Sequence, residues 1–320
     1  MAREKIDDSD AFITEVCWHY YVNSMTQADI ARHMDVTRLR VNQAIQRAKS
    51  LGMVKVQIES PFLPRIELQE KLVATYGLDQ AMVAPADPEH YDYNYPAGAA
   101  LASFLQRRVE TGDLRKIGVS WGITLQSAIA NMPRQSHPDL EVISMFGGTV
   151  RGATFNSFAI VSGLAERLGA SYSILAAPNF LSKGVDRDLF LSQEQFREHF
   201  DKFEQLDAAV LTCSDISAKS YLVQEGLPPE VSPQDLIDAG AVGDVVGIFL
   251  DRNGIAVPTP LSSRTIGISL ETLLRVPLRV LVAAGPHKAE IIRAVLRQGI
   301  ANTLITDDVT AEMLLEDSAP

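Results

Sequence analysis

The segment that decides the fold reads Ile117-Gly118-Val119-Ser120-Trp121-Gly122-Ile123-Thr124-Leu125. A short apolar run ends at Ser120, and Gly122 stands directly before the apolar pattern of a helix. A buried strand that passes through glycine into a helix is typical of α/β sheets, in which the helix N-terminus directs N–H groups toward an anion. The segment therefore predicts a phosphate cradle built from backbone N–H groups and from the Ser120 and Thr124 hydroxyls.

The same alternation of apolar strands and amphipathic helices extends over the chain after residue 60. We expect strands at 80–84, 114–120, 140–146, 171–176, 208–212, 244–250, 278–283 and 303–306, and helices at 97–109, 125–131, 157–168, 288–297 and 308–315. Near-continuous hydrophobic strands separated by helices predict a Rossmann-like α/β domain with a mostly parallel sheet covered on both faces. The Asn253-Gly254 pair predicts a two-residue hairpin that joins 245–250 to 255–258.

Three further loops follow expected strands, and ligands of such sheets bind at the carboxyl ends of the strands. Gly147 and Gly148 follow one strand, Asp244 brings a carboxylate to a glycine-lined edge, and Lys288 places a cation at the start of a helix. Several glycine-rich turns in one sheet favour a small anionic ligand, although each alone also serves a tight connection. Asp244 and Lys288 form either an ion pair that grips the ligand, which we prefer, or an acid/base or Schiff-base pair.

The first 60 residues predict a helix-turn-helix with a wing. Thr26 has the character of an N-cap, and Thr37 is the N-cap candidate of a longer helix over 38–51. Apolar and polar residues alternate over 54–58, which is the period of a half-buried strand. A short helix, a tight turn and a longer helix are the plan of many DNA-binding domains.

The longer helix has an apolar stripe and a polar face. The residues expected to pack inward are Val41, Ala44, Ile45, Ala48 and Leu51. Arginine offers a donor fork to guanine, and asparagine or glutamine can pair with adenine. The residues expected to contact DNA are Thr26, Gln27, Thr37, Arg38, Arg40, Asn42, Gln43 and Arg47. The alternative is a small solvated helical bundle that serves in dimerisation.

Pro61 and Pro64, two prolines within four residues, oppose continuation of a helix and indicate a joint between two domains, 1–60 and 61–320. Charge is also distributed unevenly along the chain. The net charge of the 320 residues is −11, yet residues 26–60 hold six basic and three acidic residues, so that this segment carries +3 and the rest −14. A polyanion would therefore be bound by the local field of the amino-terminal segment, not by the field of the whole chain. The hydrophobic share of 46% excludes wholesale disorder.

Several protein classes are excluded. No apolar run approaches the roughly 18–20 residues of a membrane helix, and the charged opening lacks the apolar core of a signal peptide, so we expect a cytoplasmic protein that has no membrane partner. Cys17 and Cys213 offer neither a disulfide framework nor a cysteine-built zinc site. The six histidines share no metal-ligand spacing, and no nucleophile elbow is present. We expect no metal and no cofactor.

The chain resembles the SorC family of sugar-responsive bacterial transcription regulators. The resemblance is carried, in the family's order, by residues 25–31, 37–42, 117–125, 242–244 and 288–294. It implies an amino-terminal DNA-binding domain and an effector domain built like sugar-phosphate isomerases. It also implies homodimers or homotetramers that bind operator DNA and respond to a phosphorylated sugar or polyol, with the erythritol-operon repressors as the nearest subgroup.

The resemblance also assigns roles to single residues. Gly122 and Thr124 match the phosphate-loop positions, Asp244 matches the carboxylate that receives sugar hydroxyls, and Lys288 matches the cation beside the ligand. Asn156 falls where family members often place a ligand-contacting amide. The expected effector-binding residues are thus Ser120, Gly122, Thr124, Gly147, Gly148, Asn156, Asp244 and Lys288.

Two departures from the family pattern bear on the effector. Phe158 stands where asparagine is common, and Met145-Phe146 stand where some members have a phosphate-gripping arginine. Either Arg151 replaces that arginine, or the effector is smaller or less charged. The expected function is repression of a carbohydrate or polyol operon, without enzymatic activity. The alternative is a sugar-phosphate isomerase or aldolase-like enzyme with an accessory helical domain.

Overall fold

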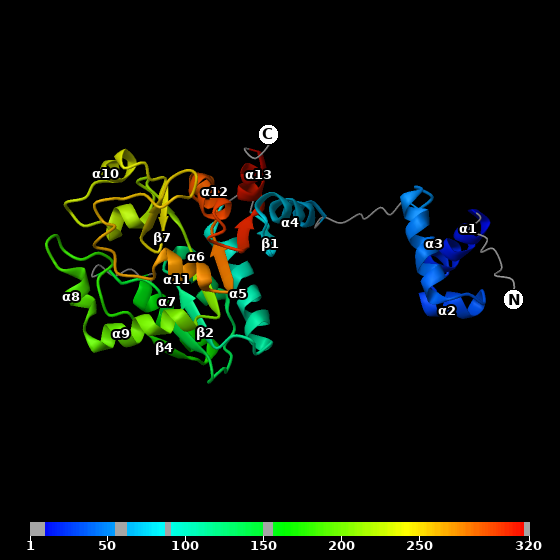
Figure 1. The fold of residues 1–320 in the computed structure, drawn as a ribbon, viewed down its shortest axis with the longest axis horizontal. Coiled ribbons are helices and arrows are strands. Elements are labelled where there is room, and N and C mark those ends of the chain that lie inside the picture. Colours follow the sequence, from blue (N-terminus) through cyan, green and yellow to red (C-terminus); the bar gives the residue numbers. More distant parts are fainter. Residues whose placement is uncertain (1–9, 55–62, 87–90, 150–155, 317–320) are drawn as a thin grey trace. The chain divides into compact units, whose positions relative to one another are not determined.

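The chain forms two compact units, which comprise Met1–Leu63 and Pro64–Pro320. The structure, a computed structural model, describes residues 10–54, 63–86, 91–149 and 156–316 (Figure 1). The division falls close to the boundary expected after residue 60. Each unit has a hydrophobic core of its own.

The N-terminal unit is helical. Helix α1 (Asp10–Cys17) continues into a π-helix (Trp18–Val22), and α2 (Gln27–His33) and α3 (Arg38–Ser50) follow. The helices enclose a small core of buried side chains: Ile13, Val16, Cys17, Ile30, Ala31, Val41, Ala44, Ile45 and Ala48. The helix-turn-helix prediction is confirmed in the order and length of α2 and α3. Most of the predicted wing strand, 54–58, lies outside the described residues.

Both expected N-caps are present, and they fix where the two helices begin. The Thr26 hydroxyl accepts a hydrogen bond from the Asp29 backbone N–H at 3.2 Å and donates to the Asp29 carboxylate at 2.6 Å. The Thr37 hydroxyl accepts from the Arg40 backbone N–H at 3.3 Å. A capped first turn satisfies N–H groups that have no partner inside the helix. The Thr37 cap therefore fixes the start of α3 and keeps the turn between α2 and α3 short.

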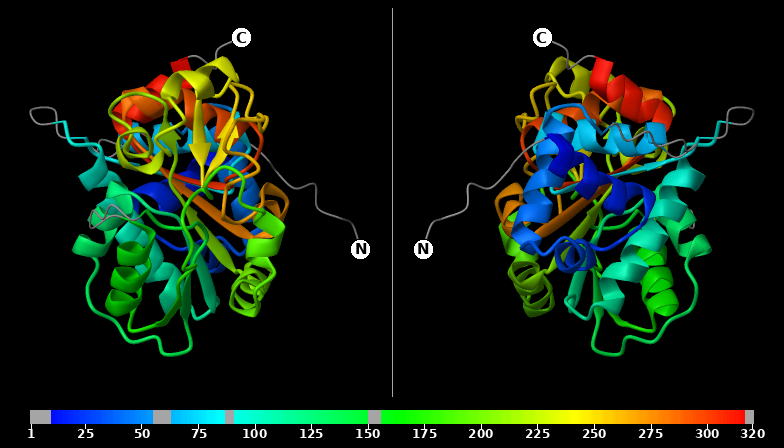
Figure 2. Two further views of the ribbon diagram at one scale, coloured as in Figure 1. Left: turned by 90° about the vertical axis from the view of Figure 1, so that its left-hand side faces the viewer. Right: turned by 90° about the vertical axis from the view of Figure 1, so that its right-hand side faces the viewer.

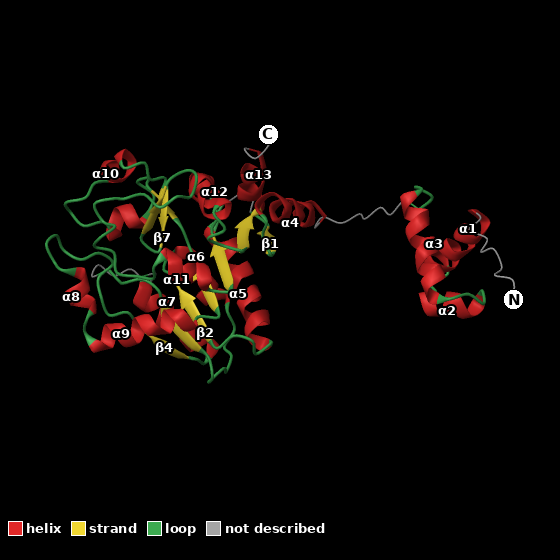
Figure 3. Ribbon diagram, viewed as in Figure 1, coloured by secondary structure: helices red, strands yellow, loops and turns green. Residues whose placement is uncertain are grey.

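The C-terminal unit is built on a seven-stranded parallel sheet with the order β1-β10-β9-β5-β2-β3-β4 (Figure 3). The strands are β1 (Gln80–Ala84), β2 (Lys116–Val119), β3 (Glu141–Ser144), β4 (Ser171–Ser173), β5 (Ala208–Leu211), β9 (Leu278–Val282) and β10 (Thr303–Asp307). All seven were expected within a few residues. A parallel sheet needs cover on both faces, which explains the continuous apolar runs of its strands.

Helices lie on both faces of this sheet (Figures 1 and 3). One face packs against α5 (Asn94–Glu110), α6 (Ile123–Asn131) and α7 (Ser157–Leu168), which share one hydrophobic cluster with the strands. A second cluster holds residues of the remaining helices: α4 (Leu63–Tyr76), α9 (Glu194–Asp201), α10 (Pro233–Asp238), α11 (Leu270–Arg275), α12 (Ala289–Arg297) and α13 (Asp308–Glu316). The short α8 (Arg187–Leu191) precedes α9, and α4 and α8 to α11 have no counterpart among the expected helices.

A small antiparallel sheet of β6 (Ser214–Asp215), β7 (Gly243–Val245) and β8 (Ile248–Leu250) lies near α12, in yellow and green in Figure 2. The single strand expected over 244–250 is therefore wrong. Val246 and Gly247 have positive φ values of 47° and 78°, which is the geometry of a tight type I′ hairpin turn between β7 and β8. The hydrophobic run hides this turn because Val246 is an unusual residue for positive φ.

The hairpin expected at Asn253-Gly254 is present in a shorter form. Leu250 pairs with Ala256 in a single antiparallel bridge, and the Gly254 N–H donates to the Asp251 carbonyl at 2.9 Å. The Asp251 carboxylate also accepts from the N–H groups of Asn253 and Ile255. The carboxylate therefore stabilises a four-residue turn, of which only Gly254 has a positive φ, 81°. Over the described ranges, no helix combines the length and the apolar character needed to cross a bilayer.

Candidate functional site

A pocket of about 60 Å³ opens beyond the carboxyl ends of β2 and β5. Of the residues expected to bind the effector, it brings together Gly122, Thr124 and Lys288. Its other lining residues come from the start of α5, from the β2–α6 connection and the start of α6, from the segment around β6, and from the 3-10 helix Pro286–Lys288: Tyr93, Asn94, Trp121, Ile123, Thr212, Cys213, Ser214, Lys219, Ser220, Tyr221 and His287. The pocket thus lies where ligands of parallel α/β sheets bind.

One wall of the pocket is the N-terminus of α6. Gly122 is the N-cap residue, with φ 130°, and no side-chain hydrogen bond caps the first turn. Since a glycine has no side chain to accept from the first N–H groups, these groups are left to water or to a ligand. The uncapped turn and the helix dipole together favour an anion at this position.

The two hydroxyls expected in the cradle have different roles. The Thr124 hydroxyl donates to the Asn94 amide oxygen at 2.8 Å, and both residues line the pocket. Ser120 is 1% exposed, and its hydroxyl accepts from the Thr212 N–H at 2.9 Å, which ties the end of β2 to the end of β5. Ser120 does not line the pocket, so the structure gives it a supporting role behind the wall.

Two lysines supply the positive charge of the pocket. Lys288 was expected there, and Lys219, from the loop after β6, was not. His287 packs against the Tyr93 ring at 5.0 Å between ring centroids. Burial lowers the pKa of His287, and the charges of Lys288 and Lys219 lower it further, against the opposing effect of Asp215. The lowered pKa favours the neutral form of the imidazole.

Asp244 lies on β7, opposite the pocket-lining Ser214 on β6, and is 2% exposed. Burial raises the pKa of its carboxyl to about 7, although the Gly247 N–H, the Ser214 hydroxyl and the Lys288 charge all act to lower it. One carboxylate oxygen accepts from the Gly247 N–H at 2.9 Å, and the other has no hydrogen-bond partner among the described residues. Among the described residues, Asp244 and Lys288 do not form the expected ion pair, although the charge of Lys288 acts on the Asp244 carboxyl.

Three expected effector-binding residues lie away from the pocket. The N–H groups of Gly147 and Gly148 donate to the carbonyls of Ile266 and Ala177, at 2.9 and 2.8 Å. A Cβ at Gly147 would lie 2.4 Å from the Pro178 carbonyl oxygen, so this glycine permits a close backbone approach. The Asn156 side chain caps α7 by accepting from the Ala159 N–H at 2.9 Å.

All three residues therefore make contacts that stabilise the fold, and none of them lines the pocket. Arg151, the suggested replacement for a phosphate-gripping arginine, lies outside the described residues.

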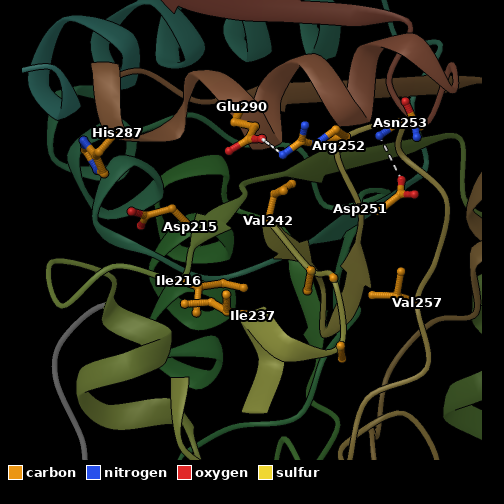
Figure 4. A pocket seen from close by; sticks show the side chains of 13 residues that line it. Asp215, Ile216, Ile237, Val242, Asp251, Arg252, Asn253, Val257, His287 and Glu290 are labelled. Atoms are coloured by element: carbon orange, nitrogen blue, oxygen red, sulfur yellow. Dashed lines mark hydrogen bonds and ion pairs between the residues drawn. The ribbon is translucent and has the colours of Figure 1, made fainter. Parts of the chain in front are cut away.

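A larger hollow of about 730 Å³ adjoins the pocket and shares His287 with it (Figure 4). Figure 4 shows the Arg252–Glu290 ion pair, 3.9 Å long, along one edge of this hollow and Ile216 with Ile237 along another. The lining also includes Asp215 and Asp251. Because three carboxylates face it against one arginine, this hollow disfavours phosphate.

The N-terminal unit presents its own candidate surface on α3. Val41, Ala44, Ile45 and Ala48 are buried as expected, whereas Leu51 is 56% exposed. The prediction for Leu51 was wrong because α3 ends at Ser50, and the chain leaves the helical spacing there. Arg38, Gln43 and Arg47 are exposed, while Gln27 and Asn42 are half-buried.

Arg40 departs from the expected open position. Its side chain is half-buried, and its guanidinium carbon lies 4.4 Å from the centroid of the Phe12 ring. This cation–π contact draws the guanidinium toward α1. A separate hollow of about 720 Å³ is lined by three of the expected DNA-binding residues, Thr26, Gln27 and Arg38.

Comparison with known proteins identifies the family of the chain. Residues 60–316 match the family described as "Putative sugar-binding domain". The erythritol catabolism regulatory protein EryD of Brucella abortus is 31% identical over 311 residues, which cover 97% of this chain and 98% of EryD. The sorbitol operon regulator of Klebsiella pneumoniae is 26% identical over 97% of this chain and 99% of that protein.

The similarity extends to solved structures. The full-length sorbitol operon regulator SorC from Klebsiella pneumoniae superposes with a TM-score of 0.72 and 25% identity, over 96% of this chain and 99% of that chain. A transcriptional regulator from Streptococcus pneumoniae has the same TM-score over 80% of this chain, at 24% identity. Because the family match covers most of the chain and the relatives align along nearly all of it, the chain belongs to the SorC family of sugar-responsive transcriptional regulators.

Proposed function

We propose that this protein represses a carbohydrate or polyol catabolic operon in the cytoplasm and that a phosphorylated sugar or polyol in the C-terminal pocket controls its grip on operator DNA. The matched relatives are named regulators of erythritol catabolism and of the sorbitol operon. They are transcriptional regulators, and this chain is accordingly a regulator and not an enzyme. The isomerase or aldolase alternative therefore has no support.

One observation carries the proposal for the effector. The uncapped N-terminus of α6, Lys219 and Lys288 all line one small pocket. A phosphate monoester carries about −1.5 to −2 charges at pH 7 and three acceptor oxygens, so it matches these donors in charge and in number. Charge-assisted hydrogen bonds of this kind each contribute about 1.5–3 kcal/mol.

The rest of the pocket suits the hydroxyl groups of a sugar or polyol. Ser214 and Ser220 bring hydroxyls to the lining, and Asn94 brings an amide. Ser220 is 4% exposed, and its hydroxyl has no hydrogen-bond partner among the described residues. Since a buried hydroxyl without a partner costs free energy, a ligand hydroxyl that pairs with it would be bound selectively.

Control of DNA binding needs at least two copies of the chain. Helix-turn-helix units read two half-sites about one helical turn of DNA apart, which requires a symmetric dimer or a dimer of dimers. An effector that prefers one arrangement of the copies shifts the operator affinity by about 5–150-fold, or ~1–3 kcal/mol per linked site. The homodimer or homotetramer is part of this proposal.

The experiment is a thermal-shift and calorimetric titration of the full chain with erythritol phosphates, sorbitol 6-phosphate, the unphosphorylated polyols and inorganic phosphate. We expect the unfolding temperature to rise with a polyol phosphate and not with the unphosphorylated polyols or inorganic phosphate. The reason is that a ligand that binds only the folded state stabilises it by mass action. Lys288→Met should weaken that ligand by about 10–150-fold, since it removes a charge-assisted bond worth about 1.5–3 kcal/mol.

Lys183→Met is the matched control, because Lys183 is an exposed lysine that does not line the pocket. Equal affinities in the Lys288 and Lys183 variants would show that the ligand binds elsewhere. Steady release of a converted product would contradict the assignment as a regulator.

A further inference from the structure

Helix α3 carries an outward stripe that differs from the residues expected to read DNA. Leu39, Gln43 and Gln46 are spaced four and three residues apart, so they share one face of the helix. All three are exposed, and they lie opposite the buried Val41, Ala44, Ile45 and Ala48. The most outward side chains of α3 are thus one leucine and two amides, not arginines.

Leu39 is the informative member of this stripe. It is 67% exposed although it is apolar, and it is the second residue of α3, directly after Arg38. The apolar core of the unit lies on the other side of the helix, and Leu39 does not belong to this core among the described residues. In helix-turn-helix proteins, the first residues of the second helix meet the base edges in the major groove.

Arg40, which was expected to contact DNA, is directed toward α1 instead. Arg40 is half-buried with its guanidinium over the Phe12 ring, and this contact competes with a bidentate bond to guanine. Arg38, Arg47 and Lys49 are exposed on the flanks of the stripe. Basic groups on both sides of a neutral strip complement duplex DNA, whose phosphates flank a groove of uncharged base edges.

We infer that Leu39 contacts the C5-methyl group of a thymine and that Gln43 pairs with a neighbouring adenine, so that each operator half-site presents A·T pairs to the start of α3. The inference rests on the proposed DNA-binding function. The thymine methyl is the apolar group that the major groove displays, and the N6 and N7 atoms of adenine match the amide of glutamine. Leu39 is therefore a specificity residue, and Arg38, Arg47 and Lys49 are phosphate contacts.

The test removes single methyl groups from the DNA. Duplexes are selected from a random-sequence library with the full-length protein, and each thymine of the selected site is replaced in turn by deoxyuridine, which lacks only the C5-methyl. We expect one position in each half-site at which this replacement weakens binding by about fourfold, the effect of about one buried methyl group.

Leu39→Ala should bind the thymine duplex more weakly and lose the response to deoxyuridine at that position. Because Leu39 is exposed, the variant keeps its fold, which an unchanged thermal unfolding curve confirms. Leu51→Ala is the matched control, since Leu51 is also an exposed leucine of the same unit but lies at the C-cap, off the stripe. This control should keep the response to deoxyuridine.

The possible results separate the inference from the function on which it rests. If the library yields no selected duplex, the proposed DNA binding fails and the inference falls with it. If a site is selected but no thymine responds, or if Leu39→Ala still responds, DNA binding stands and the role of Leu39 is overturned. A selected site with G·C pairs at both contacted positions would likewise overturn the inference, because it would assign base recognition to an arginine.

Discussion

The two units recognise their ligands by opposite means. On α3, the side chains proposed to contact DNA are long and mostly exposed, and the core beneath them consists of a few small and aliphatic side chains. In the C-terminal unit, the pocket is lined by Gly122 at the N-terminus of α6 and by Lys219 and Lys288. The carboxyl of Asp244, which is 2% exposed, lies on β7 opposite the pocket-lining Ser214. In the proposed function, the first surface contacts a large polyanion in water, whereas the second encloses a small ligand.

This difference predicts different sensitivities. Long exposed side chains contribute to binding and little to folding, so their loss changes affinity alone. A buried carboxyl is coupled to the folding of its unit and to pH, because burial penalises its charged form. The core of the small unit has few members, so each of them matters more for stability than a typical residue of the large sheet.

The largest effect is expected for the core of the N-terminal unit. Ile45 is 2% exposed, and Ile45→Ala should lower the stability of this unit by about 2–5 kcal/mol through lost transfer energy and a cavity. Operator binding should then be lost at 37 °C, while the calorimetric affinity for a polyol phosphate stays unchanged. Leu51→Ala is the exposed control, and a parallel loss of effector affinity in Ile45→Ala would contradict two separate units.

The second prediction concerns the pH dependence that Asp244 imposes. The folded state keeps the Asp244 proton up to about pH 7, whereas the unfolded chain releases it near the ordinary pKa of 3.8. The folded state therefore binds more protons between pH 4 and pH 7, and the free energy of unfolding falls as the pH rises through this window. The fall is at most about 4 kcal/mol, and it ends above pH 7.

Asp244→Asn should remove this contribution, since an amide does not titrate. Urea unfolding at pH 5, 6, 7 and 8 is expected to show the variant gaining stability relative to the unchanged protein as the pH rises. Asp188→Asn, at a side chain that is 96% exposed, should leave the slope as it is. A constant difference between Asp244→Asn and the unchanged chain at all four pH values would refute the buried, protonated carboxyl.

The same contrast explains which features could be read from the sequence. The N-caps at Thr26 and Thr37, the strand over 80–84 and the helix that begins after Gly122 depend on local residue chemistry, and the structure confirms these elements. Their signals lie within a few residues of the atoms that they place. The parallel strands could be predicted for the same reason, because burial on both faces makes each one a continuous apolar run.

Other features depend on contacts between distant parts of the chain. Lys219 reaches the pocket because the β6–β7 pairing brings its loop beside α6, and no motif near Lys219 indicates this. Ser120 fits a cradle by position but is used to hold β5. The turn at Val246-Gly247 and the contact of Arg40 with Phe12 are likewise set by packing. The periodicity of a single segment carries no information about its packing partners, so these features could not be predicted.

The smallest expected effects come from two helix caps, one in each unit. Thr37→Ala and Asn156→Ala should each cost about 1 kcal/mol, because each leaves an N–H group of a first turn without its acceptor. Thr37→Ala should weaken operator binding severalfold, since it loosens the end of α3 that carries Leu39. Asn156→Ala should lower the unfolding temperature and leave the affinity for a polyol phosphate unchanged, because Asn156 does not line the pocket. A loss of effector affinity in Asn156→Ala with an unchanged unfolding temperature would instead make this amide a ligand contact, as the family resemblance implies, and would extend the effector site from α6 to α7.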